Sequence, residues 1–104
     1  MTAAKITPTF IGKELISQNM DEDSTTTRRM ARLHLEGPKA SISDWFLLSD
    51  YLTAAQVKDY TGHTEQLANN TFVLETFTYD ADDAKLVLGH ASAGTSHVVV
   101  TYYE

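Results

Sequence analysis

Two histidines and one glutamate are the residues of this chain whose types and spacing best suit chemistry. If a hairpin turns at residues 93–94, His90 and His97 face each other across neighbouring strands. If a preceding hairpin turns at residues 82–83, Glu75 faces His90, and neighbouring Cβ atoms in such a row lie about 5 Å apart. Two imidazoles and a carboxylate can bind zinc or iron, or can transfer protons.

The row of Glu75, His90 and His97 supports two hypotheses. One is a metal-dependent or histidine-based enzyme, and the other is a row of solvated or hydrogen-bonded histidines without a catalytic role. Both registers are inferred from turn positions, and a slip of one residue moves a side chain to the other face of a sheet. The sequence therefore favours the second hypothesis, and we expect no metal and no cofactor.

Two other segments carry motif-like residues that turns explain better. Residues 89–96 contain two glycines, like a phosphate-binding loop, but they include no lysine and precede a strand-like segment. Asp80, Asp82 and Asp83 could hold a hard cation, but the glycine and the final glutamate of a calcium loop are missing. Aspartate also favours turns, because its side chain bonds nearby backbone amides. We expect hairpin turns at both places.

The one dense basic patch consists of Arg28, Arg29 and Arg32, which could clamp a phosphate or a carboxylate. Arg28 and Arg32 would share a strand face with His34 and Glu36, which favours a local charge network between strands. The whole chain has fourteen acidic and eight basic residues, a formal net charge of −6. Because nucleic-acid binders usually present a basic face, we do not expect nucleic acid as a partner.

The chain also lacks the residues and motifs of other common catalytic sites. The chain has no cysteine, which excludes disulfides and thiolate-bound metals. It contains neither a recognisable nucleophile elbow nor an HExxH motif. The sequence therefore predicts a protein that is not an enzyme.

The elements that would position these residues begin with two extended segments. Residues 10–18 and 26–36 are strand-like, and apolar and polar residues alternate over 31–36, as in a half-buried strand. The polar residues 21–24 between them indicate a hairpin. Gly37-Pro38 predicts a break in the chain after this hairpin, because proline cannot donate to a strand ladder.

The middle of the chain carries helix signals, and the last third returns to strands. Trp45 and Leu48 recur at the spacing of one helix face, and Thr53 begins a capping-box pattern. We therefore expect one bent or two short helices between about 43 and 61, with Trp45 in the core. Residues 72–79, 85–91 and 96–103 are rich in β-branched and aromatic residues. The order ββ–α–βββ predicts a single α+β domain over 1–104, with an antiparallel sheet and its helices on one face.

The final strand is apolar on both faces, and such strands are usually covered on both sides. One helical layer covers only one side of a sheet, so the other side needs a partner. We expect a protein interface there, formed with a different protein or with a second copy. Its expected residues are Val99, Tyr103, Phe77, Tyr79 and Leu88.

The small size, the acidity and this apolar surplus favour a non-enzymatic protein that acts stoichiometrically on a protein partner. It could be an inhibitor or accessory factor of bacterial or viral origin, or a subunit of a symmetric assembly. The alternative is the enzyme described above. No segment approaches the roughly 20 apolar residues that cross a bilayer, and the N-terminus does not resemble a signal peptide. We therefore expect a cytoplasmic location and no membrane partner.

Overall fold

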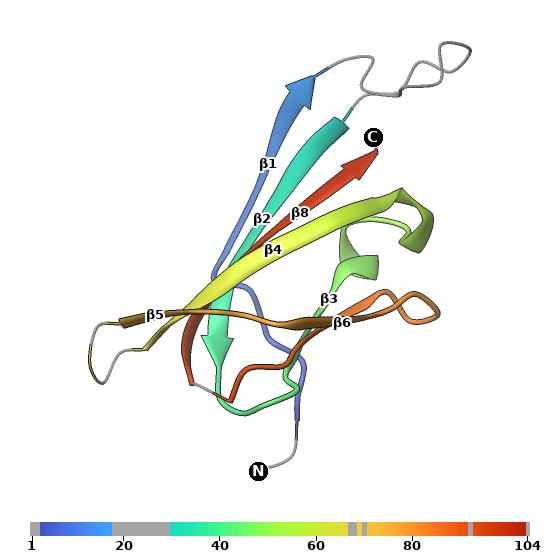
Figure 1. Cartoon of the computed structure of the whole chain (residues 1–104). Coiled ribbons are helices and arrows are strands. Elements are labelled where there is room, and N and C mark those ends of the chain that lie inside the picture. The colour runs from blue at the N-terminus through green and yellow to red at the C-terminus, as the bar shows by residue number, and fades with distance from the viewer. Residues whose placement is uncertain (1–2, 18–29, 67–68, 70, 92, 104) are drawn as a thin grey trace.

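The computed structural model describes residues 3–17, 30–66, 69, 71–91 and 93–103. Strands account for 63% of these residues and helices for 7%, and no helix among them reaches seven residues. The α+β fold expected from the sequence is therefore wrong. The described chain is mostly antiparallel β-sheet (Figure 1).

Five strands form the larger of two sheets, in the order β1-β2-β8-β4-β5. Every neighbouring pair is antiparallel. The final strand of the chain, β8, lies at the centre, between β2 and β4. The strands are β1 Phe10–Ser17, β2 Met30–Lys39, β8 Gly94–Tyr103, β4 Val57–Gln66 and β5 Thr71–Leu74.

Three short strands form the smaller sheet, in the order β3-β7-β6. They are β3 Trp45–Leu47, β7 Lys85–Leu88 and β6 Phe77–Asp80. In Figure 1, β5 and β6 follow each other almost along one line, although they belong to different sheets. The expected strand 72–79 is therefore divided in two, and its two halves tie the sheets together.

The core lies between the two sheets. Along β2 and β8 the side chains alternate between buried and more exposed positions, because successive residues of a strand point to opposite faces. The buried ones meet inward-facing residues of the smaller sheet and Ile6 from the N-terminal segment. One continuous cluster results, made mainly of Ile6, Leu33, Leu35, Phe46, Leu48, Leu86, Leu88, Val98, Val100 and Tyr102.

The helix predicted between residues 43 and 61 is absent. β3 and the first part of β4 occupy most of this range, with single 3₁₀ turns at Leu48–Asp50 and Ala54–Gln56 between them. The capping-box prediction survives on a smaller scale, since the Gln56 side chain accepts the Thr53 N–H at 2.8 Å. The Gln56 side-chain amide also donates to the carbonyl of Tyr103 at 2.8 Å. This hydrogen bond connects the Ala54–Gln56 turn to β8.

Trp45 does not lie in the core. In a strand the inward positions recur every second residue, so Phe46 and Leu48 are fully buried while Trp45 is only half-buried. The ammonium of Lys85 lies 4.6 Å from the centre of the Trp45 ring, a cation–π distance. The helical spacing of Trp45 and Leu48 therefore predicted that Trp45 is buried, whereas the strand buries its neighbour Phe46.

The first predicted hairpin is confirmed in its pairing, since β1 and β2 are antiparallel neighbours; residues 21–24, its expected turn, lie outside the described residues. The predicted break at Gly37-Pro38 is wrong, because β2 continues to Lys39. β1 pairs with β2 only as far as Glu36, so Pro38 lies where β2 has a partner on one side, as proline requires. Gly37 admits the N-terminal segment, since a Cβ there would lie 2.7 Å from Ile6.

The two later hairpin predictions have opposite outcomes. β6 and β7 pair in the expected register, with Asp80 opposite Lys85. The Asp80 carboxylate accepts the N–H groups of Asp82 at 3.1 Å and Asp83 at 3.4 Å, which confirms an aspartate-based turn. The hairpin expected to join His90 and His97 does not exist, because β7 and β8 belong to different sheets. None of the described helices has the length and hydropathy to cross a membrane.

A buried ion pair holds the two sheets together at one end. Lys39 ends β2, and Glu75 lies where the chain passes from β5 to β6. The Lys39 ammonium donates to the Glu75 carboxylate and to the carbonyl of His90, and neither charged side chain has any exposed surface. The Thr64 hydroxyl and the N–H of His90 also donate to this carboxylate. The buried charges are therefore paired and hydrogen-bonded.

A second polar cluster organises the connection between β2 and β3. The buried Asp44 carboxylate accepts backbone N–H groups from Ala4 at 2.9 Å, Ala40 at 2.8 Å and Ser41 at 3.1 Å. Burial alone would raise the pKa of Asp44. These hydrogen bonds, with one from the Ser41 hydroxyl, outweigh burial and hold the pKa below its ordinary value of 3.8.

We predict that breaking the buried pair destabilises the protein much more than removing both of its charges. Lys39→Met leaves Glu75 buried without its partner and should cost about 3–5 kcal/mol, whereas Lys39→Met with Glu75→Leu should recover most of this loss. Urea titration of the wild type, both single variants and the double variant measures the coupling. Lys5→Met is the control, because its pair with Asp50 is exposed and worth at most about 1 kcal/mol. Equal costs for Lys5→Met and Lys39→Met would contradict the prediction.

We predict that Asp44 makes stability depend on pH in the acid range. Its pKa is lower in the folded than in the unfolded chain, so its contribution is complete above the ordinary value and is lost as pH falls through the folded pKa. Asp44→Asn should cost about 1–3 kcal/mol at pH 7, and the difference from wild type should shrink towards pH 3. Asp83→Asn, at an exposed position, should show no such trend. A constant difference between Asp44→Asn and wild type from pH 7 to pH 3 would contradict this.

Candidate binding surface

The structure does not bring Glu75, His90 and His97 together in a row. Glu75 is buried at the inner end of the sandwich, and it contacts His90 through the backbone N–H at 3.0 Å. His97 lies on β8 and faces His63 of β4 and Glu36 of β2. The sequence hypothesis assumed that consecutive strands pair, but the chain changes sheets between β7 and β8. The proposed catalytic group is therefore divided between two regions.

The five residues expected at an interface lie in two different places. Val99 and Tyr103 alternate with the core residues of β8 and point away from the smaller sheet. Phe77 and Tyr79 pack against the core from β6, where both are partly buried. Leu88 is completely buried in the core, so it has no surface to offer a partner while the fold is intact.

The arginine patch is described only at Arg32, since Arg28 and Arg29 lie outside the described residues. Arg32 stands opposite Glu14 on β1, and its guanidinium lies 3.2 Å from the Glu14 carboxylate. This pair is the local cross-strand contact that the sequence favoured over an anion clamp.

The face of the larger sheet that points away from the core, here called the outer face, carries the most distinctive group of side chains. The registers of the four strand pairs align one residue from each strand in a single row. In order from β1 to β5 the row is Phe10, Glu36, His97, His63 and Leu74. Its ends are apolar and its middle is polar and ionisable.

The apolar ends of the outer face are largely exposed. Phe10 on β1 is 53% exposed, and Phe72 and Leu74 on β5 are 64% and 78% exposed. Sequence reasoning missed Phe72 and Leu74, although their spacing of two residues places them on the same face of a strand. Their exposure depends on which elements cover the strand, which periodicity does not reveal.

His97 occupies the centre of the outer face between two carboxylates. Its Nδ1 lies 3.2 Å from Glu36 Oε1, and its Nε2 lies 3.9 Å from Glu65 Oε2. The ring stacks on His63 with centroids 4.9 Å apart, and His63 meets Phe72 edge to face at 5.3 Å. Sequence reasoning missed His63 because it assigned the first part of β4 to a helix.

The polar middle of the face has unused hydrogen-bonding capacity. Among the described residues, the Nε2 atoms of His34 and His97 are buried and find no hydrogen-bond partner, although buried polar groups usually have one. No group of three or more histidine, aspartate or glutamate side chains within the described part of the chain is placed to hold a metal ion.

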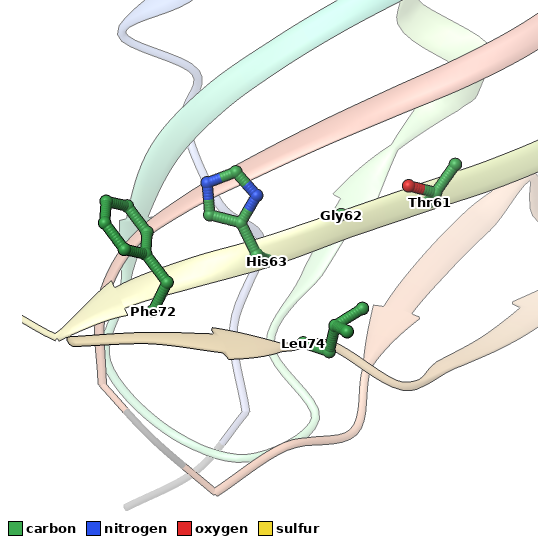
Figure 2. Close-up of a pocket in the computed structure, with 5 residues that line it drawn as sticks. All are labelled: Thr61, Gly62, His63, Phe72 and Leu74. Carbon is green, nitrogen blue, oxygen red and sulfur yellow. The ribbon is translucent and has the colours of Figure 1, made fainter.

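Three hollows lie along the outer face. The largest, an open groove of about 580 Å³, is lined by Thr61, Gly62 and His63 of β4 and by Phe72 and Leu74 of β5. Figure 2 shows the side chains of His63, Phe72 and Leu74 rising from the same side of the two strands. Gly62 leaves room on the other side of the sheet, since a Cβ there would lie 2.5 Å from the His97 carbonyl and 3.1 Å from the Phe77 ring.

The two smaller hollows lie on the opposite flank. One of about 130 Å³ lies between β2 and β8 and includes both His34 and His97. The other, of about 270 Å³, is lined by Phe10 and Glu14 of β1 and by His34. The outer face is thus an apolar and histidine-rich surface with relief on both flanks, suited to noncovalent binding.

No family model matches this chain, and neither the curated proteins nor the solved structures contain a match to it.

We predict that the outer face tolerates charges that the inner face does not. Leu74→Asp should change stability by no more than about 0.5 kcal/mol at low protein concentration, as expected at an exposed site. Val98→Asp, in the same sheet but facing the core, should unfold the chain because it buries an unpaired charge. Thermal unfolding followed by circular dichroism measures both. A large loss of stability for Leu74→Asp would show that β5 is covered.

Proposed function

We propose that this protein is a non-enzymatic binding protein whose docking surface is the outer face of the larger sheet. It acts stoichiometrically, as an inhibitor or accessory factor of a protein partner or as a subunit of an assembly. The observation that carries the proposal is the set of uncovered apolar side chains at both flanks of the face, Phe10, Phe72 and Leu74.

The composition of the face supports binding in preference to catalysis. Apolar flanks around a centre that can form hydrogen bonds provide both buried area and specificity in protein interfaces. The smaller sheet covers only the inner face, so Phe72 and Leu74 stay mostly exposed, with His63 against one edge of the Phe72 ring. The row of Glu75, His90 and His97 that suggested an enzyme does not form, because His97 lies on the outer face while Glu75 is buried with Lys39.

We predict that proteins bound stoichiometrically depend on the outer face. Wild type, Leu74→Asp and Ile42→Asp should be immobilised as baits and exposed to extract from the native host. Ile42 is a matched control, since it is exposed to 53% and lies in the connection after β2, outside the larger sheet. A partner, or further copies of the chain, should be retained near one to one by wild type and Ile42→Asp and lost with Leu74→Asp.

Two results would overturn the proposal. One is equal retention by all three baits, which would place the docking surface elsewhere. The other is a wild type that stays monomeric at high concentration and retains no partner in stoichiometric amount. Circular dichroism of each bait confirms that the comparison is made between folded proteins.

A further inference from the structure

We infer that the outer face binds a second copy of this chain, in a two-fold dimer whose axis runs parallel to β8. The inference rests on the proposed function, because it requires the outer face to be a docking surface. It adds the identity of the partner and the register of the contact.

The pattern of residues across the face supports self-association. The row from β1 to β5 reads Phe10, Glu36, His97, His63, Leu74, and a two-fold axis along the central strand reverses it. Phe10 of one copy then faces Leu74 of the other, and Glu36 faces His63. Apolar groups meet apolar groups and carboxylates meet imidazoles, while His97 lies beside its own copy on the axis.

The neighbouring row is compatible with the same axis. It contains His34 on β2, Val99 on β8 and Thr61 on β4. Reversal places Val99 against Val99 and brings His34 opposite Thr61, so no like charges meet along this row.

An axis perpendicular to the strands is less favourable. If it ran along the row from Phe10 to Leu74, it would set each strand of the larger sheet against itself, with Glu36 facing Glu36. Like charges placed directly opposite each other are destabilising. Charge complementarity therefore selects the axis parallel to β8.

The area of the face is suited to a dimer. The five strands have four to ten residues each. At about 3.3 Å per residue and about 4.8 Å between strands they present roughly 650 Å² in projection, before side-chain relief is counted. Each partner in a standard interface buries about 800 Å² of accessible surface. An isologous contact of this kind also covers both copies of the apolar flanks at once.

Cross-linking in this cysteine-free chain tests the register. Facing sheets lie about 10 Å apart, so a bismaleimide with a short spacer can join engineered cysteines across the contact. Phe10→Cys co-expressed with Leu74→Cys should give a cross-linked dimer at least ten times faster than Phe10→Cys alone. Ile42→Cys, outside the face, should behave like Phe10→Cys alone. Equal rates for Phe10→Cys alone and for the mixture would overturn the proposed axis.

A charge exchange provides a second test. Glu36→Lys should raise the dimer dissociation constant at least tenfold in analytical ultracentrifugation, and adding His63→Glu should restore most of the affinity. Within one copy these residues are separated by β8, so recovery reports a contact between copies. Circular dichroism verifies the fold of each variant, and failure of His63→Glu to restore affinity would contradict the register.

The failures of the two proposals are distinguishable. A wild type that is monomeric in light scattering at high concentration, but retains a different protein through Leu74, overturns the dimer and leaves the proposed function standing. A monomer that retains nothing overturns both.

Discussion

The buried contact between Lys39 and Glu75 is the constraint on which the rest of the structure depends. It lies where the chain passes between sheets: Lys39 ends β2 just before the connection to β3, Glu75 separates β5 from β6, and the carbonyl of His90 belongs to the connection from β7 to β8. An unpaired charge in this dry position would be very unfavourable, so packings that separate these segments are excluded. A buried ion pair need not increase the free energy of unfolding. It does disfavour other arrangements of the strands, because those would leave one of the two charges buried without its partner.

The difference in size between the two sheets has a functional consequence. Three strands of three or four residues cannot cover five strands of up to ten residues, and they lie on only one face of the larger sheet. Even on that face, Ile11 and Leu15 of β1 remain about half exposed. The outer face receives no cover from any described element. The apolar flanks are therefore exposed because the chain forms only two layers. In a fold with a third layer on the outer face, the same side chains would be buried.

The histidines illustrate how a sheet converts scattered residues into one surface. His34, His63 and His97 come from three strands that are distant in sequence and adjacent in the sheet, and all three lie on the outer face. Because antiparallel pairing aligns residues one by one, they share that face with Glu36 and Glu65. An imidazole can donate or accept a hydrogen bond, so this centre can form specific contacts that the apolar flanks alone would not provide. Binding strength and binding specificity thus arise from different residues of the same face.

The sequence by itself determined the local features. Alternation over residues 31–36 identified β2, and the aspartates after Tyr79 identified the β6–β7 turn. These features depend on neighbours within a few residues, so periodicity and turn chemistry report them. Only the tertiary structure decided which strands pair. The spacing of Trp45, Leu48 and Leu52 fits a helix as well as a strand followed by a turn, and packing against β7 decided between them. His90 and His97 were separated by a change of sheet that depends on the distant Lys39–Glu75 pair, and a contact between residues 36 positions apart leaves no local signal in the sequence.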